Sequence, residues 1–99
     1  MKLILYTPEK VPITLTDIKK GTTLAEVLIK ADISRNDIVI FTGQPGDSNA
    51  TPLVKRELAL EEYNMWVDND YDSVYISLYI KEDTGSYNYE RYKMYSNLW

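Results

Sequence analysis

The 99-residue sequence predicts one α+β domain, in which a single helix packs against a β-sheet. Two segments near the N-terminus and one near residue 75 alternate apolar and polar side chains with the period of a β-strand. Between them, one segment carries apolar residues at helical spacing. The chain is 44% apolar and 26% charged, which is the composition of a folded domain of this length. A second globular domain is therefore excluded, and general disorder is disfavoured.

The N-terminal segment predicts a β-hairpin. Residues 1–7 alternate apolar and polar side chains, and so do residues 11–16. A turn containing Pro8 separates them. Pro12 has no amide hydrogen to donate to a neighbouring strand, so the second strand is expected at an edge of the sheet.

Residues 23–31 predict the helix. Thr23 and Glu26 have the spacing of a capping box, in which the hydroxyl and the carboxylate bind the first free amides of a helix. The residues after Thr23 form a single apolar stripe, which would lie on the sheet. The stripe consists of Leu24, Val27, Leu28 and Ala31.

The rest of the sheet comes from segments further along the chain. Residues 38–41 are β-branched and aromatic and predict a third strand, Leu53-Val54 a very short one, and residues 57–65 one or two helical turns. Residues 73–80 have the clearest strand alternation, with aliphatic side chains on one face and tyrosines on the other. The expected core is Leu3, Leu5, Ile13, Leu15, Leu24, Val27, Leu28, Phe41, Leu60, Val74, Ile76 and Leu78.

The order of these elements, and several residues, resemble the ubiquitin-like β-grasp family over residues 1–80. The family's opening hairpin is resembled by Met1-Lys2-Leu3-Ile4-Leu5-Tyr6 and Ile13-Thr14-Leu15. Its third strand and the following glycine turn are resembled by Ile40-Phe41-Thr42-Gly43-Gln44. Leu58-Ala59-Leu60-Glu61-Glu62-Tyr63-Asn64-Met65 is the most specific match, to a stretch whose tyrosine pins a loop and whose final aliphatic residue enters the core. The resemblance implies a mixed sheet with strand order 2-1-5-3-4 and a helix across one face. We expect a ubiquitin-like domain at residues 1–82 and a tyrosine-rich extension at residues 83–99 that packs on it.

A protein-binding surface is expected on the sheet face away from the helix. The family has a hydrophobic patch there, and Ile40 matches its third-strand aliphatic residue, while the other residues are outward positions on neighbouring strands. Aromatic residues of the extension either fold over this face as a second core layer or form a recognition arm, because Tyr and Trp are enriched in binding hot spots. The expected contact residues are Ile4, Tyr6, Ile40, Tyr75, Tyr79, Tyr87, Tyr89 and Trp99.

The residue types disfavour catalysis and cofactor binding. The chain has no Cys and no His, so thiol and imidazole chemistry is absent, and with it the usual zinc and iron ligands. Asp68, Asp70 and Asp72 have part of the spacing of a calcium-binding loop, but its glycine and its twelfth-position glutamate are missing. The family's conjugation chemistry needs a Gly-Gly end, whereas this sequence ends Asn97-Leu98-Trp99. We therefore expect a non-enzymatic protein without a cofactor or a bound metal.

The charge distribution bears on partners and location. The net charge is −4, with +2 over residues 1–56 and −6 over residues 57–99, which disfavours a nucleic-acid ligand. No signal sequence or membrane span is recognised, so a cytoplasmic location is expected. The first hypothesis is a module that binds a protein of unknown identity, or a second copy of itself. The alternative is a small acidic phage or mobile-element inhibitor, whose carboxylates imitate nucleic-acid phosphates on a DNA- or RNA-binding protein.

Overall fold

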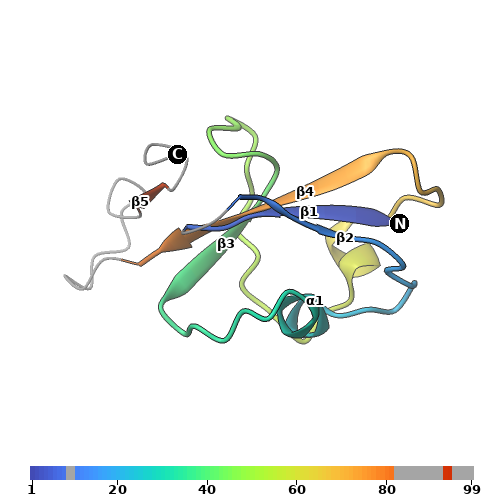
Figure 1. The fold of residues 1–99 in the computed structure, drawn as a ribbon, viewed down its shortest axis with the longest axis horizontal. Helices are drawn as coiled ribbons and strands as arrows, with labels where there is room; N and C mark the ends of the chain where they lie inside the picture. The colour runs from blue at the N-terminus through green and yellow to red at the C-terminus, as the bar shows by residue number, and fades with distance from the viewer. Residues whose placement is uncertain (9–10, 82–92, 95–99) are drawn as a thin grey trace.

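The computed structural model describes residues 1–8 and 11–81, and the backbone of Lys93 and Met94. Within these residues, one helix lies on one side of a β-sheet (Figure 1). The elements are β1 (Lys2–Tyr6), β2 (Ile13–Leu15), α1 (Leu24–Lys30), β3 (Ile38–Thr42), the 3-10 helix η1 (Leu60–Tyr63), β4 (Ser73–Ile80) and β5 (Lys93–Met94). The predicted α+β class is confirmed.

The sheet is mixed, with the strand order β2-β1-β4-β3. β1 and β2 form the predicted antiparallel hairpin, with Leu3 opposite Leu15. β1 runs parallel to β4, and β3 runs antiparallel to β4. The two central strands therefore come from opposite ends of the described chain, and β2 lies at an edge, as Pro12 predicted.

Helix α1 begins at the predicted capping box. The backbone amide of Glu26 donates to Thr23 Oγ1, and the amide of Thr23 donates to Glu26 Oε1, both at 3.2 Å. Leu24, Val27 and Leu28 are buried against the sheet. The chain turns at the end of the helix through Asp32, which has a φ of 59°.

The core lies between α1, η1 and one face of the sheet, which we call the inner face. Residues of β1 and β4 point into it alternately, and every predicted core residue except Phe41 belongs to this layer or packs against it. Several other members were not in the list of expected core residues, although the helical stripe placed Ala31 on the sheet and the resemblance implied that Met65 enters the core. They are Met1, Ile18, Ala31, Ile38, Ile40, Leu53 and Met65.

The prediction for the faces of β3 was wrong. Ile40 is 3% exposed and lies opposite Leu78 in the inner layer, whereas Phe41 is opposite Ser77 on the outer face. Because residues 38–41 are all apolar, they show no alternation that sets the face. The β3–β4 register decides it instead.

The predicted short strand at Leu53-Val54 does not form. Phe41 and Pro52 make a single bridge, in which Leu53 donates to the Ile40 carbonyl, and Val54 is then 82% exposed. The hydroxyl of Tyr63 accepts from the amide of Lys55 and donates to its carbonyl, so the backbone that follows Val54 bonds to a side chain and not to a strand. The resemblance implied such a pinning tyrosine, but the strand next to β3 is reduced to one bridge.

The predicted extension from residue 83 falls almost entirely outside the described residues. Its described part is the backbone of β5, which pairs antiparallel with Tyr79 and Ile80 of β4. No helix in the described residues is long and apolar enough to cross a membrane.

Candidate protein-binding surface

The outer face of the sheet, opposite α1, has two parts. Tyr6 of β1 and Tyr75 of β4 form the first, with ring centroids 6.1 Å apart and planes tilted by 31°. Ile4 lies directly opposite Tyr75 in the β1–β4 register. All three side chains are partly exposed. We call this group, Ile4, Tyr6 and Tyr75, the Tyr6–Tyr75 patch.

The second part contains Phe41 and Tyr79, which are buried. Their rings meet edge to face with centroids 5.4 Å apart, a favourable arrangement for aromatic pairs. Phe41 is 7% exposed and Tyr79 is 2% exposed. The loop after β3 rises on the side of the sheet away from α1 (Figure 1), and it returns to pair Pro52 with Phe41. We call these two residues the Phe41–Tyr79 pair.

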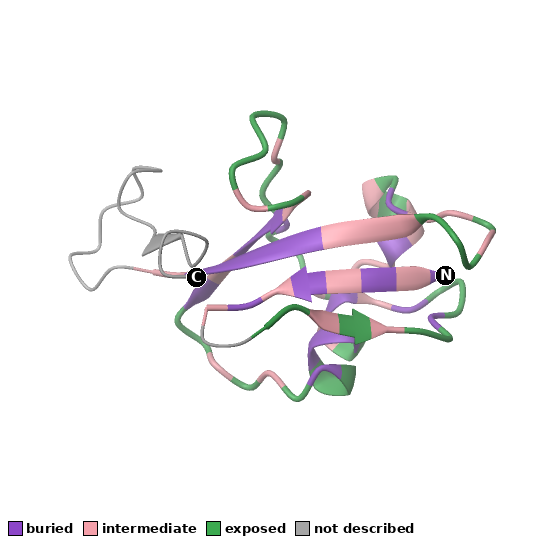
Figure 2. Cartoon of the chain, turned by 45° about the horizontal axis from the view of Figure 1, so that its top comes forward, coloured by how far each residue is buried: buried purple, intermediate pink, exposed green. Residues whose placement is uncertain are grey.

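Ser77 separates the patch from the pair. It lies between Tyr75 and Tyr79 on the outer face, is 1% exposed, and donates its hydroxyl hydrogen to the Gly43 carbonyl. The amide of Gly43 donates to the Tyr75 carbonyl, so the turn after β3 is bound to β4 at both Tyr75 and Ser77. Figure 2 shows the result along β4: its first half is of intermediate burial and its second half is buried.

The turn after β3 needs a glycine at position 43. Gly43 has a φ of 87°, where side chains are strained, and a Cβ there would lie 2.4 Å from Asp47 Oδ2. Asp47 also accepts from the amide of Asn49. The turn is therefore closely packed, which fixes the direction in which the loop leaves β3.

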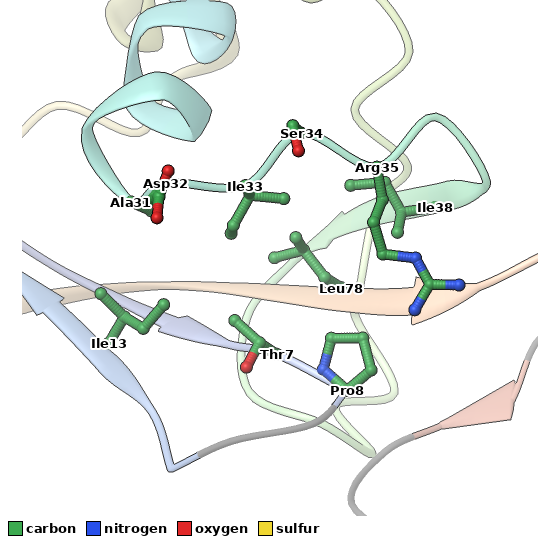
Figure 3. A pocket seen from close by; sticks show the side chains of 10 residues that line it. All are labelled: Thr7, Pro8, Ile13, Ala31, Asp32, Ile33, Ser34, Arg35, Ile38 and Leu78. Atoms are coloured by element: carbon green, nitrogen blue, oxygen red, sulfur yellow. The ribbon is translucent and has the colours of Figure 1, made fainter.

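A cavity of about 140 Å³ opens between the end of the sheet and the segment after α1 (Figure 3). Ile13, Ile33, Ile38 and Leu78 supply most of its apolar surface, and Thr7 and Pro8 line it from the end of β1. A cavity of this size holds one benzene-sized group.

Arg35 and Asp37 form an ion pair beside this cavity. Arg35 Nε and Nη2 donate to the two carboxylate oxygens of Asp37 at 2.8 and 2.6 Å. These hydrogen bonds, with the positive charge of Arg35, lower the pKa of the Asp37 carboxyl. Both side chains are well exposed, so the pair contributes little to stability.

The three aspartates in the loop before β4 have separate partners. Asp70 accepts from the N-terminal ammonium at 2.9 Å, Asp68 from the indole nitrogen of Trp66, and Asp72 from the side-chain amide of Asn69. Among the described residues, no group of three Asp or Glu side chains could hold a metal ion. The carboxylates here fasten the loop and the N-terminus.

The structure brings together three of the predicted contact residues, Ile4, Tyr6 and Tyr75. Tyr79 is on the predicted face but buried, and Ile40 is on the opposite face. Tyr87, Tyr89 and Trp99 lie outside the described residues. The sequence analysis missed Phe41 and Val39 on the outer face, and the register with Ser77 and Tyr79 places them there.

Comparison of the sequence with models of known protein families and with curated proteins finds no match.

Proposed function

We propose that this chain is a non-enzymatic protein-interaction module with a ubiquitin-like fold, which binds a partner protein through the outer face of its sheet. The observation that carries the proposal is the Tyr6–Tyr75 patch. Two tyrosine rings and an isoleucine are contiguous on a sheet face and remain partly exposed. Tyrosine presents a large contact area with a polar hydroxyl at its tip, and it is enriched among residues that dominate binding energy.

The architecture supports the ubiquitin-like part of the proposal. A hairpin, a capped helix, an antiparallel third strand and a final strand parallel to the first follow in the order that the resemblance implies. The Tyr63 hydroxyl on the Lys55 backbone adds a specific local likeness. The single bridge at Phe41 and Pro52, in place of a full strand, is a departure from that pattern.

Affinity capture with matched variants tests the proposal. The full chain is compared with Tyr75→Ala and with Tyr71→Ala, a control in the exposed loop before β4 where the side chain is 83% exposed. We expect a partner protein that Tyr75→Ala loses and Tyr71→Ala retains. Equal retention by both variants would exclude the outer face as the binding surface.

Salt dependence separates this proposal from nucleic-acid mimicry. Binding through an aromatic patch changes little with ionic strength, because the contact carries no charge pairs. Binding by carboxylates in a basic groove weakens steeply as salt rises. A partner that salt releases and that Tyr75→Ala still binds would favour mimicry.

A further inference from the structure

We propose that the cavity between the end of the sheet and the segment after α1 is a binding site for a small uncharged molecule. The ligand class is a single ring or a branched aliphatic group that carries one oxygen, as in a phenol or a cyclic alcohol. The inference is argued from the size and lining of the cavity and from a buried hydroxyl without a partner. It does not depend on the proposed function, because the apolar lining belongs to the inner layer of the sheet.

Apolar side chains from separate parts of the chain form the walls of the cavity. Ile33 follows α1, Ile38 begins β3, and Leu78 lies in the second half of β4. Figure 3 shows the side chains of Ile33 and Leu78 directed toward one another. Ile38 and Leu78 are buried members of the core, so the packing of the domain holds this wall in place.

The volume of the cavity limits the size of the ligand. It measures about 140 Å³. An apolar cavity of about 150 Å³ binds one benzene molecule, so a single ring fits here. A nucleotide or a peptide segment would have to remain largely outside, which favours a small molecule as the occupant.

Thr7 supplies the polar group of the site. It lines the cavity from the end of β1 and is 5% exposed. Its Oγ1 is buried and has no hydrogen-bond partner among the residues that the structure describes. Buried hydroxyls are nearly always hydrogen-bonded, because an unpaired one has lost its bonds to water without replacement. A ligand oxygen that pairs with the Thr7 hydroxyl would remove this cost.

The charges at the cavity favour an uncharged ligand. Asp32 and Arg35 are the charged residues among those that line it. Arg35 donates two hydrogen bonds to Asp37, so a carboxylate already balances its charge. A charged ligand would lose water between the apolar walls without gaining a counter-ion of its own, and this loss is costly.

Titration of the full chain with phenol, followed by NMR of the isoleucine methyl groups, tests the assignment. We expect the signals of Ile13, Ile33 and Ile38 to shift to saturation with one dissociation constant. Ile29, which is 75% exposed on α1, and Ile4, on the outer face of the sheet, are internal controls and should show no saturable shift. Shifts that do not saturate at the lining residues, or that are as large at Ile4 and Ile29, would overturn the proposal.

Thr7→Val tests the role of the hydroxyl, because valine keeps the shape of the side chain. We expect the affinity for phenol to fall about 2- to 10-fold, which corresponds to one neutral hydrogen bond, and the affinity for benzene to stay unchanged. Thr14→Val, at an exposed position of β2, is the matched control and should change neither affinity. Equal losses for phenol and benzene in Thr7→Val would contradict the assigned role.

The stability of the unliganded Thr7→Val protein gives a second measurement. The hydroxyl has no protein partner to lose, so this variant should have the same Tm as the wild type or a higher one. A clearly lower Tm would show that the hydroxyl is already hydrogen-bonded without a ligand, and it would remove the polar half of the argument.

Ala31→Leu tests the cavity itself. Ala31 lines the cavity at the end of α1, and a leucine side chain there should fill the space and abolish the binding of both phenol and benzene. Circular dichroism establishes that the variant is folded, and Ile33→Phe replaces it if it is not. Ala50→Leu, in the loop after β3, is the matched control and should bind as the wild type does. Undiminished binding by a folded cavity-filling variant would place the ligand elsewhere and refute the proposal. None of these results bears on whether a partner protein requires Tyr75.

Discussion

The two faces of the sheet are covered in different ways. On the inner face, α1 and η1 lie over the strands, and Leu3, Leu5, Ile76 and Leu78 are at most 2% exposed. On the outer face no helix of the described residues is present, and full burial is confined to Ser77 and the Phe41–Tyr79 pair. The same alternation in β4 therefore produces a closed core on one side and a surface that is half closed on the other.

This difference shows what residue alternation does and does not determine. Alternation assigns side chains to a face, and it does so correctly for Tyr75 and Tyr79 alike. Whether a face is buried depends on tertiary contacts of loops and turns, such as the Ser77 hydroxyl on the Gly43 carbonyl. The following substitutions test what buries each face of the sheet.

The largest effect is expected at the closed end of the outer face. Phe41→Ala removes a buried ring that contacts Tyr79 edge to face, and it should lower the free energy of unfolding by about 3–5 kcal/mol. Urea denaturation followed by circular dichroism measures this loss. A loss no larger than that of Tyr6→Ala would show that the two parts of the outer face do not differ.

The division between the two parts depends on Ser77. Ser77→Ala leaves the Gly43 carbonyl without its buried donor, which should lower the free energy of unfolding by about 1–3 kcal/mol. Ser48→Ala, in the exposed loop after β3, is the control and should have no effect beyond error. Amide exchange at Gly43 should quicken in the first variant, and unchanged exchange there would argue against this role.

The covering of the inner face is sensitive to the cap of α1. Thr23→Ala removes the acceptor of the Glu26 amide and should lower the free energy of unfolding by about 1 kcal/mol. Thermal denaturation measures it. A variant as stable as the wild type would mean that the cap does not help to hold α1 on the sheet.

A smaller energy is expected for the contact within the Tyr6–Tyr75 patch. A double-mutant cycle of Tyr6→Ala and Tyr75→Ala should give a coupling of about 0.5–1.5 kcal/mol, because the rings are near each other but partly solvated. Urea midpoints of the four proteins supply the cycle. A coupling as large as that between Phe41 and Tyr79 would contradict the distinction between an open and a closed part.

The smallest effect is expected at the exposed ion pair beside the cavity. Arg35→Gln removes the hydrogen bonds that lower the pKa of Asp37, so this pKa should rise toward its usual value, as followed by NMR titration. In the wild type the lowered pKa gives a small stabilisation above the usual carboxyl range, and it is lost as the pH falls through the lowered pKa. An unchanged pKa in Arg35→Gln would rule out the arginine as its cause.

The sequence was sufficient for elements with a clear period and a clear boundary. The β1–β2 hairpin, the cap at Thr23 and the strand at residues 73–80 each combine a pattern with a local stop signal. The sequence was insufficient where a segment is uniformly apolar, or where contacts with residues elsewhere in the chain decide the structure. Ile38 to Phe41 have no polar residue to set their face, and pairing with β3 stops at a single bridge before Leu53-Val54, where no local signal in the sequence marks the stop. Of the predicted surface, the tyrosines of β1 and β4 were found, but their different burial was not.

The parallel pairing of β1 with β4 has a consequence for the newly made chain. Lys2 pairs with Ser73, so β1 can pair with β4 only after about 70 further residues have been synthesised. Between Leu15 and Ser73 a ribosome working at roughly 5–20 residues per second needs about 3–12 s. During that time β1 has no partner on the side that β4 occupies in the folded domain, and the core residues Ile76 and Leu78 have not been made. The sheet and its core can therefore be completed only after Ser73–Ile80 has been synthesised.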